Sequence, residues 1–298
     1  MSECGCGAQR RLPEWFRQEI PDAVALGEMR TLLQETRLHT VCEGARCPNL
    51  GECWAERTAT FMILGQSCSR GCHFCAVPHG TGAIVDDEEP LFVADAVHRL
   101  GLRYVVITSV TRDDLPDGGA NHFARTVRAL RQRIVGIGVE LLIPDFQGDA
   151  DLLRIVAEAE PDVVGHNIET VRRLSPVVRS GAEHDRSLSV LRTLRHQMKA
   201  GKVKSGLMVG MGETDQEVLA TLRELREAGC EIVTIGQYLA PTRGARHVKV
   251  DRFVDPGTFE MYRREGERMG FSFIHSGPLV RSSYLAEQAF RACAGKET

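Results

Sequence analysis

The cysteines are the residues of this chain whose number and spacing point to chemistry. Six of the ten form two triads: the first triad is Cys42, Cys47 and Cys53, and the second triad is Cys68, Cys72 and Cys75. A cluster of four irons and four sulfides normally takes four cysteine ligands, so a triad leaves one iron open. An open position on a metal is typical of a catalytic site rather than a structural one.

The second triad has the spacing Cys-x3-Cys-x2-Cys, and a tight loop with Gly71 would let three sulfurs converge on one cluster. Arg70 would add positive charge beside the thiolates. A zinc site is the alternative, because His73 or His79 could supply a fourth ligand. We expect the iron-sulfur cluster.

Length and composition limit the classes of protein to which this chain can belong. A chain of 298 residues suits one large α/β domain or two ordinary ones, and its 43% hydrophobic and 26% charged residues exclude a disordered or fibrous protein. The net charge of -3 gives no indication that the protein binds nucleic acid or an anionic membrane surface. Met1 to Arg11 shows no secretory apolar run, and no stretch reaches the length of a membrane span. We therefore expect a cytoplasmic protein, in which cysteines serve metal or redox chemistry rather than disulfides.

Three segments are expected: an N-terminal extension (1–57) that carries the first triad, a repeated βα region (58–270), and a C-terminal extension (271–298). The predicted strands are Thr60–Leu64, Tyr104–Val110, Val139–Pro144, Asp162–Asn167, Ser205–Gly210 and Glu231–Tyr238. The predicted helices are Leu91–Leu100, Asn121–Ile134, Asp149–Glu160, Ser187–Ala200, Asp215–Gly229 and Pro256–Gly270, followed by a short apolar run, Phe271–His275. Thr214 and Glu217 have the spacing of a capping box.

Six βα units cannot close an eight-stranded barrel. The α/β fold expected is therefore a partial (β/α)6 barrel of the TIM type, with the two extensions covering its open side, and a doubly wound open sheet is the alternative. In both folds function gathers at the carboxyl ends of the strands, and the second triad follows the first predicted strand.

The second triad, directly after that strand, resembles the signature of the radical S-adenosylmethionine (SAM) superfamily. The resemblance implies a 4Fe-4S cluster whose open iron binds SAM and cleaves it to a 5′-deoxyadenosyl radical. It places Phe74 near the adenine. The segment Gly206 to Glu213, with Met208 and Gly210, resembles the superfamily pattern in which an apolar side chain and the backbone approach the adenine.

For the other candidate SAM contacts, a purely structural role is the alternative. Asn167 and Glu169, at a strand end, correspond to positions where relatives bind the ribose and methionine of SAM, but they could equally satisfy buried backbone. Arg179 is a candidate for the methionine carboxylate. Ser109 is a candidate for the amino group, although a strand-end turn would explain it too.

The first triad, within the segment from Cys42 to Trp54, resembles the signature of the lipoyl synthase family. Further matches are Arg112–Gly119, His166–Thr170, Gly236–Leu239 and Ser276–Tyr284. Ser180 and His184 depart from the usual family pattern, which puts only their loop in doubt.

The resemblance implies a second, auxiliary 4Fe-4S cluster on the first triad, with Ser283 as the fourth ligand and Arg281 beside it. Ser282 is the nearest competitor, since either hydroxyl could instead cap a helix, and Cys293 is a rival ligand. In this family the auxiliary cluster gives up its sulfur. The substrate is an octanoyl group on a lysine of a carrier, either a lipoyl domain or the glycine cleavage H protein, and sulfur enters at C6 and C8.

The resemblance also implies an electron donor such as flavodoxin or ferredoxin, and an iron-sulfur carrier that rebuilds the spent cluster. Two rivals stay open. One is another sulfur-inserting enzyme of the superfamily, such as a methylthiotransferase or biotin synthase. The other is a protein without radical chemistry, either an electron carrier with two clusters or a zinc-binding module.

Overall fold

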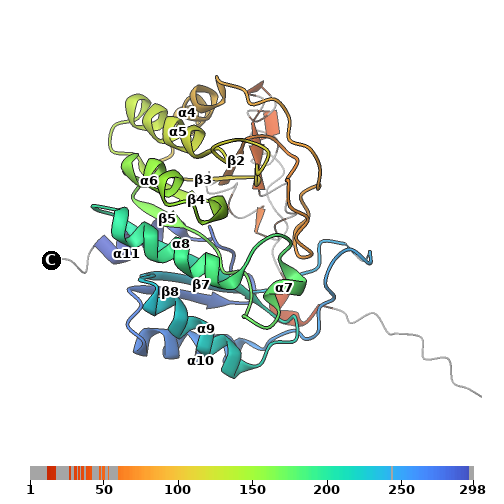
Figure 1. Cartoon of the computed structure of the whole chain (residues 1–298). Helices are drawn as coiled ribbons and strands as arrows, with labels where there is room; N and C mark the ends of the chain where they lie inside the picture. The colour runs from red at the N-terminus through yellow and green to blue at the C-terminus, as the bar shows by residue number, and fades with distance from the viewer. Residues whose placement is uncertain are drawn as a thin grey trace, which may run out of the picture.

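The computed structural model describes residues 12–17, 27, 30, 31, 33, 35, 36, 38–41, 47, 49, 50, 53, 60–242 and 244–294. From residue 60 onward strands and helices alternate along the chain (Figure 1), which confirms the predicted α/β class. Most of the predicted extension 1–57, including Cys42, lies outside the described residues. In the part that is described, no helix combines the length and apolar character that crossing a membrane requires.

The described strands form one sheet in the order β1 to β8, with β1 antiparallel to β2 and all other neighbours parallel. Their bounds are β1 His39–Thr40, β2 Thr60–Ile63, β3 Tyr104–Ser109, β4 Gly138–Leu142, β5 Val163–Gly165, β6 Lys202–Val209, β7 Ile232–Gln237 and β8 Phe273–Gly277. No pairing joins β8 back to β1 among these strands, so the barrel is partial, as expected.

The count of parallel strands differs from the prediction. β8 pairs with β7, so the short run predicted at Phe271–His275 is a seventh parallel strand of the barrel. β6 begins at Lys202, three residues before the predicted start. The lysines at its beginning hid the strand in the sequence, because Lys204 turns inward and is neutralised there. The division at residues 57 and 270 stays a prediction.

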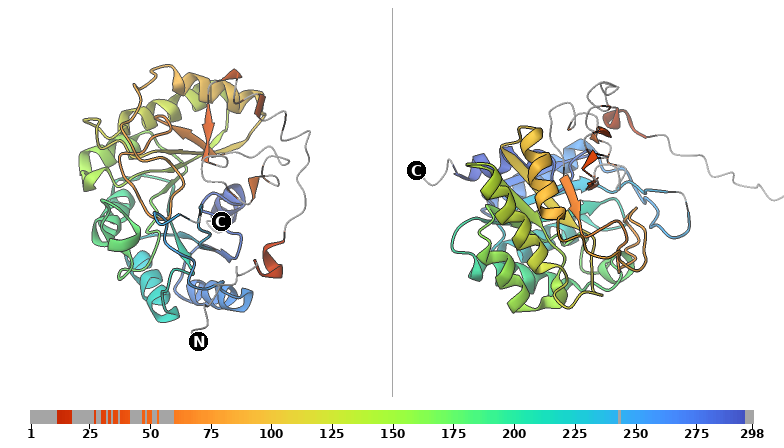
Figure 2. Two further views of the ribbon diagram at one scale, coloured as in Figure 1. Left: turned by 90° about the vertical axis from the view of Figure 1, so that its right-hand side faces the viewer. Right: turned by 90° about the horizontal axis from the view of Figure 1, so that it is seen from above.

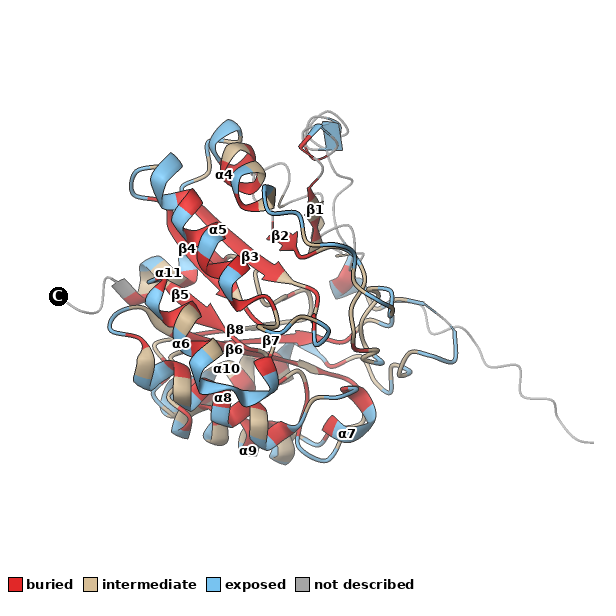
Figure 3. Ribbon diagram, turned by 45° about the horizontal axis from the view of Figure 1, so that its top comes forward, coloured by how far each residue is buried: buried red, intermediate tan, exposed pale blue. Residues whose placement is uncertain are grey.

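Six helices, α4, α5, α6, α8, α9 and α10, lie along the outer face of the sheet (Figures 1 and 3). Their bounds are α4 Glu89–Arg99, α5 Ala120–Arg133, α6 Ala150–Glu158, α7 Ser175–Val178, α8 His184–Gln197, α9 Asp215–Glu227, α10 Pro256–Arg268 and α11 Ala286–Ala294, with the 3-10 turns η1 Glu14–Phe16 and η2 Phe146–Gly148. The predicted capping box starts α9: Thr214 accepts from the Glu217 backbone, and the Glu217 side chain accepts in return. α7 and α11 were not predicted from the sequence.

Alternate residues of each strand face the inside of the partial barrel and build it in layers. One layer contains the register pairs Thr108 with Leu142 and Gly206 with Thr234. Two residues earlier on the same strands lies a lower layer, which contains the register pairs Val106 with Glu140 and Lys204 with Ile232.

The lower layer closes the inside of the barrel. Lys204 Nζ donates to Glu140 Oε1 at 2.6 Å, and Tyr104 Oη donates to Glu140 Oε2 at 2.9 Å, with both charged side chains buried. α11, the dark blue helix near the C-terminus in Figure 2, packs beneath them. Its Phe290 ring lies 5.5 Å from the Tyr104 ring. Open space inside the barrel is therefore confined to the carboxyl ends of the strands.

Arg70 fixes the loop that follows β2 to the rest of the barrel. Its guanidinium donates to both oxygens of Asp113 at 2.7 and 2.8 Å, and to both oxygens of Asp145 at 2.9 and 2.8 Å. Asp113 follows β3 and Asp145 follows β4. The expectation that Arg70 serves the thiolates with its charge is therefore wrong: two carboxylates already neutralise it.

Burial alone would raise the pKa of Asp145, but the hydrogen bonds and charge of Arg70 outweigh burial and lower this pKa to about 2. A carboxylate with a lowered pKa contributes stability above its unfolded pKa and loses it as the pH falls through the folded value. The contribution is complete above about pH 4 and disappears toward about pH 2.

We predict that Arg70→Met lowers the free energy of unfolding by about 3 kcal/mol at neutral pH, because the buried Asp145 carboxylate then keeps only the longer ion pair with Arg186, at 3.3 Å. The deficit narrows as the pH falls below about 4, since Asp145 then takes up a proton. Urea denaturation across this pH range measures both effects. Arg125→Met is the control: the pair of Arg125 with Asp87 is exposed and contributes at most about 1 kcal/mol. Equal losses in the two variants would contradict the role of Arg70.

Candidate functional site

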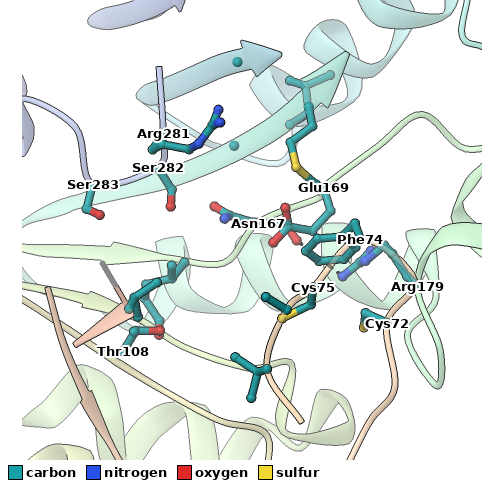
Figure 4. A pocket seen from close by; sticks show the side chains of 18 of the residues that line it. Cys72, Phe74, Cys75, Thr108, Asn167, Glu169, Arg179, Arg281, Ser282 and Ser283 are labelled. Carbon is teal, nitrogen blue, oxygen red and sulfur yellow. Dashed lines mark hydrogen bonds between the residues drawn. The ribbon is translucent and has the colours of Figure 1, made fainter. Parts of the chain in front are cut away.

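One cavity of about 480 Å³ lies at the carboxyl ends of the strands, and the three cysteines of the second triad line it. The chain reaches this place directly after β2, as the sequence predicts. Figure 4 shows Cys72 and Cys75 on one side of the cavity and Arg281, Ser282 and Ser283 on the other, with Asn167 and Glu169 between them. The second triad is thus gathered in one pocket that also receives the C-terminal serines.

Backbone hydrogen bonds fold the loop that carries the second triad. The Cys68 amide donates to Pro78 O at 2.9 Å, the Gly80 amide donates to Cys68 O at 3.0 Å, and the Cys75 amide donates to Cys72 O at 3.2 Å. A side chain at Gly71 would meet only His79, at an ordinary 3.6 Å. The space around Gly71 would therefore admit a side chain, and its role in bringing the three sulfurs together stays a prediction.

Two neighbouring segments hold the loop from outside. The His73 amide donates to Val178 O at 2.9 Å, and the Val248 amide donates to His73 O at 2.9 Å. The Nδ1 atoms of both histidines that could complete a zinc site also contact backbone carbonyls, His73 with Val177 at 2.7 Å and His79 with Cys68 at 3.2 Å. No three His, Cys, Asp or Glu side chains in the described ranges are placed to hold a single metal ion.

Burial favours the uncharged thiol at Cys72 and Cys75. Burial raises the pKa of Cys72, and it raises the pKa of Cys75 to about 11, with the charges of Cys72, Cys68 and Glu169 adding to the effect on Cys75. A metal cluster must displace these protons to bind. Cys47, Cys68, Cys72, Cys75 and Cys230 are free thiols.

Arg179 enters the cavity through a chain of hydrogen bonds. Its Nη2 donates to Ser187 Oγ at 3.0 Å, and that oxygen lies 2.9 Å from His166 Nε2, while His166 Nδ1 lies 3.0 Å from Ile143 O. Burial and the charge of Arg179 lower the pKa of His166 to about 4. The neutral ring donates from Nδ1 to the carbonyl and accepts from Ser187 at Nε2, which leaves the Ser187 oxygen free to accept from Arg179.

Two buried polar atoms at the cavity lack protein partners in the part of the chain that the structure describes: Arg179 Nη1 and Ser109 Oγ. A buried donor without a partner costs about 1–3 kcal/mol, more when charged, and such groups in native proteins point to a bound molecule. A ligand with a carboxylate and other polar groups would satisfy them. These are the groups that the sequence analysis assigned to the methionine end of SAM.

Asn167 and Glu169 follow β5 and line the same cavity. Glu169 has a φ of 64°, and its amide donates to Gly206 O at 3.0 Å while its carbonyl accepts from the Met208 amide at 2.9 Å. These bonds tie the backbone after β5 to β6 and leave the carboxylate facing the cavity. Burial raises the pKa of Glu169, although Arg179 and the hydrogen bond from Asn167 oppose the rise.

Met208 and Phe74 line the cavity and pack in one apolar cluster, but Gly210 does not line it. Gly210 has a φ of 99°, and a side chain there would come within 2.0 Å of Gln237 Nε2. Glu213 accepts from the amides of Gly210 and Met211 at 2.6 and 2.9 Å. The structure thus gives Gly210 a role in shaping the turn after β6, whereas Met208 and Phe74 are in place to contact a ligand.

Only part of the first triad can be placed. Cys47 lines the cavity, Cys53 is half-buried and is not among the lining residues, and Cys42 lies outside the described residues. Burial raises the pKa of the Cys47 thiol, and the charge of Arg281 opposes this. Asn49 Nδ2 donates to Leu279 O at 2.7 Å and so ties the region of Cys47 to the C-terminal segment.

The segment 280–283, which carries the C-terminal serines, crosses the end of β7. A side chain on Gly236 would meet Val280 O at 2.0 Å, so only glycine lets the chain pass. Arg281 Nη1 donates to Gln237 O at 3.0 Å and to Val280 O at 2.9 Å, and burial lowers the pKa of Arg281. Arg281, Ser282 and Ser283 all line the cavity.

Cys293 lies elsewhere. It is buried in α11 among Val163, Ile232 and Ala289, near the closed end of the barrel, and it does not line the cavity. The structure therefore gives no support to Cys293 as a rival ligand.

The sequence analysis missed several lining residues, above all Thr60, Met62 and Thr108. Their inward alternation on β2 and β3 was a usable signal, but it shows the face of a strand and not what that face surrounds. His166 lies in a segment that resembles the family, but the hydrogen bonds that join it through Ser187 to Arg179 could not be predicted from the sequence.

Comparisons with known proteins agree with this geometry. Residues 62–237 match the radical SAM superfamily, and residues 3–47 match the N-terminal domain of lipoyl synthase of the radical SAM family. The lipoyl synthase of Rubrobacter xylanophilus is 52% identical over 93% of this chain and 85% of its own length. That of Caldanaerobacter subterraneus is 48% identical over 96% of this chain and 99% of its own length.

Two solved structures share the fold at low identity. SuiB of Streptococcus suis, bound to S-adenosylmethionine, has a TM-score of 0.55 and 9% identity over 76% of this chain and 53% of that chain. The radical SAM enzyme coproporphyrinogen III oxidase of Escherichia coli has a TM-score of 0.51 and 15% identity, over 70% and 52% of the two chains. The sequence matches establish that this chain belongs to the lipoyl synthase family of the radical SAM superfamily.

Proposed function

We propose that this protein is a lipoyl synthase, which inserts two sulfur atoms at C6 and C8 of an octanoyl group bound to a lysine of a lipoyl carrier. Family membership supports this activity. The single observation that carries it is the shared cavity, which the second triad lines together with Cys47, Ser282 and Ser283.

The residues of the cavity fit the cofactors that the family implies, a 4Fe-4S cluster and SAM. Three free thiols converge at one end, and the unpaired Arg179 Nη1 and Ser109 Oγ lie at the same cavity. When bound, the cluster and SAM supply a 5′-deoxyadenosyl radical that removes hydrogen from the octanoyl chain.

We assign roles to the residues around SAM from their positions. Arg179 binds the methionine carboxylate, and Ser109, Asn167 and Glu169 bind its other polar groups. Phe74 and Met208 pack on the adenine. The buried pair of Glu140 and Lys204, two residues below the lining residues, keeps water from entering through the bottom of the barrel.

We further propose a second 4Fe-4S cluster on Cys42, Cys47 and Cys53, with Ser283 as the fourth ligand and the cluster as the sulfur donor. The positions of Cys47 and Ser283 at one cavity support this assignment. A serine oxygen is a harder ligand than a thiolate and suits iron-sulfur sites less well. A weakly held iron fits a cluster that must be dismantled.

The remaining partners are proposals from the family: an octanoylated lipoyl domain or glycine cleavage H protein as substrate, flavodoxin or ferredoxin as electron donor, and an iron-sulfur carrier. We also propose a cytoplasmic location, which the free thiols support.

We predict that anaerobically reconstituted protein, given SAM, a reductant and an octanoylated carrier domain, adds two sulfur atoms in place of two hydrogens. Mass spectrometry of the carrier measures this gain. Cys68→Ala and Ser283→Ala abolish it, because each removes a cluster ligand, whereas Cys293→Ala keeps it. An unmodified carrier beside fully loaded protein would refute the assignment.

Metal and sulfide analysis distinguishes a protein with two iron-sulfur clusters from a zinc-binding protein. We predict about eight irons and eight sulfides per chain, as two clusters require. Zinc without sulfide would end the radical SAM interpretation, and about four irons would leave only one cluster.

We predict that Arg179→Met raises the KM for SAM by about 10–100-fold, because a hydrogen bond to a charged group contributes about 1.5–3 kcal/mol. Arg179→Lys recovers only part of this, since lysine lacks the planar fork. Steady-state kinetics with varied SAM provides the measurement. Arg172→Met is the control, because Arg172 pairs with Asp185 and Glu224 on the surface. An unchanged KM in Arg179→Met would exclude this role.

A further inference from the structure

Thr60 contacts Ser283 through their hydroxyl groups. Thr60 Oγ1 lies 2.8 Å from Ser283 Oγ, across 223 residues of sequence, and both residues line the cavity. Thr60 is the first residue of β2 and pairs in register with Val106 of β3. It is 6% exposed. The threonine is therefore fixed by the sheet, while the serine comes from a segment outside it.

The flanking residues fix the backbone at Ser283 and leave the serine hydroxyl to Thr60. Arg281, before the serine pair, is bound to the carbonyls of Gln237 and Val280. Tyr284, after Ser283, stacks on His275 with ring centroids 5.6 Å apart. A serine hydroxyl rotates freely unless a partner holds it. The side chain of threonine is stiff at χ1 because it is branched at Cβ, so its hydroxyl offers a fixed direction.

A serine that binds iron has lost its proton, so its oxygen can only accept hydrogen bonds. The neighbouring Thr60 hydroxyl must then donate, and a donor to an ionised oxygen makes a bond about twice as strong as a neutral one. Groups that hold metal ligands in this way commonly change metal affinity about 10–100-fold when removed.

We propose that Thr60 is a positioning residue for the auxiliary cluster: it aims Ser283 Oγ into the cavity and donates a hydrogen bond to that oxygen when it binds iron. The inference rests on the proposed role of Ser283 as a ligand. It adds that the Thr60 hydroxyl determines how firmly Ser283 holds the iron.

The test uses the full chain with Cys68, Cys72 and Cys75 all changed to alanine, so that only the auxiliary cluster loads. Thr60→Val, which keeps the shape and removes the hydroxyl, is compared with Thr60→Ser, which keeps the hydroxyl. We expect Thr60→Val to release iron to a chelator about tenfold faster or more and to shift the Mössbauer signal of one iron. Thr60→Ser stays within about twofold of the parent, as expected if only the hydroxyl matters.

Ser283→Ala in the same background separates the two ideas. If it alters the Mössbauer signal while Thr60→Val matches the parent in both readouts, the Thr60 inference is wrong and the serine ligand stands. If Ser283→Ala changes nothing, the serine ligand is wrong and the Thr60 inference falls with it. Circular dichroism and thermal melting confirm the fold. Should Thr60→Val not fold, Thr60→Ala takes its place against Thr60→Ser, with the same expectations.

Discussion

The guanidinium of Arg70, shared between Asp113 and Asp145, is the interaction on which the site depends. It joins the loop of the second triad to the ends of β3 and β4 through four short hydrogen bonds. Cys68, Phe74 and Val77 of this loop pack in apolar clusters, and the polar contacts of Arg70 add fixed anchor points to that packing. Burial raises the pKa of Cys75, and the charges of Cys72 and Cys68 add to the rise because the three sulfurs would repel one another as thiolates. The anchor sets the loop before any metal is present.

The second constraint is the inner face of the sheet. Small residues line the inside of the partial barrel near the carboxyl ends of its strands, and the ion pair of Glu140 and Lys204 fills the space nearer their amino ends. The inside of the barrel is therefore a cavity with one open end. Gly206 and Gly236 leave room where a side chain would collide with Thr234 Oγ1 at 2.6 Å and with Val280 O at 2.0 Å. Two residues lower, Glu140 and Lys204 fill the space. A buried ion pair contributes little net stability compared with apolar packing, so its value here is to shape the cavity.

Much of the fold could be predicted from the sequence, because parallel strands buried on both faces appear as short apolar runs between amphipathic helices. The exceptions have physical reasons. The start of β6 was hidden by Lys204, whose charge is neutralised by a residue 64 positions away. β8 was placed outside the barrel, because a short apolar run near a terminus does not show which strand it will pair with. α7 is a single turn and gave too weak a pattern.

Some residues of the site could likewise be predicted from the sequence and others could not. The cysteines of the second triad were predictable because spacing alone brings them together. Arg70 was assigned to the thiolates, although its partners are two aspartates from other loops. The strand pattern could show that Thr60 faces inward, but it could not show its contact with Ser283, 223 positions away.

The contact between Thr60 and Ser283 also bears on how the protein is made. Its two residues are separated by 223 positions, and Ser283 stands close to the end of the 298-residue chain. Contacts of such high sequence separation are costly in loop entropy and form late in folding. The strands β2 to β7 can pair without the residues that follow β8, whereas this contact needs them. Pairing of those strands and closure of the contact between Thr60 and the C-terminal segment are therefore separable steps of folding.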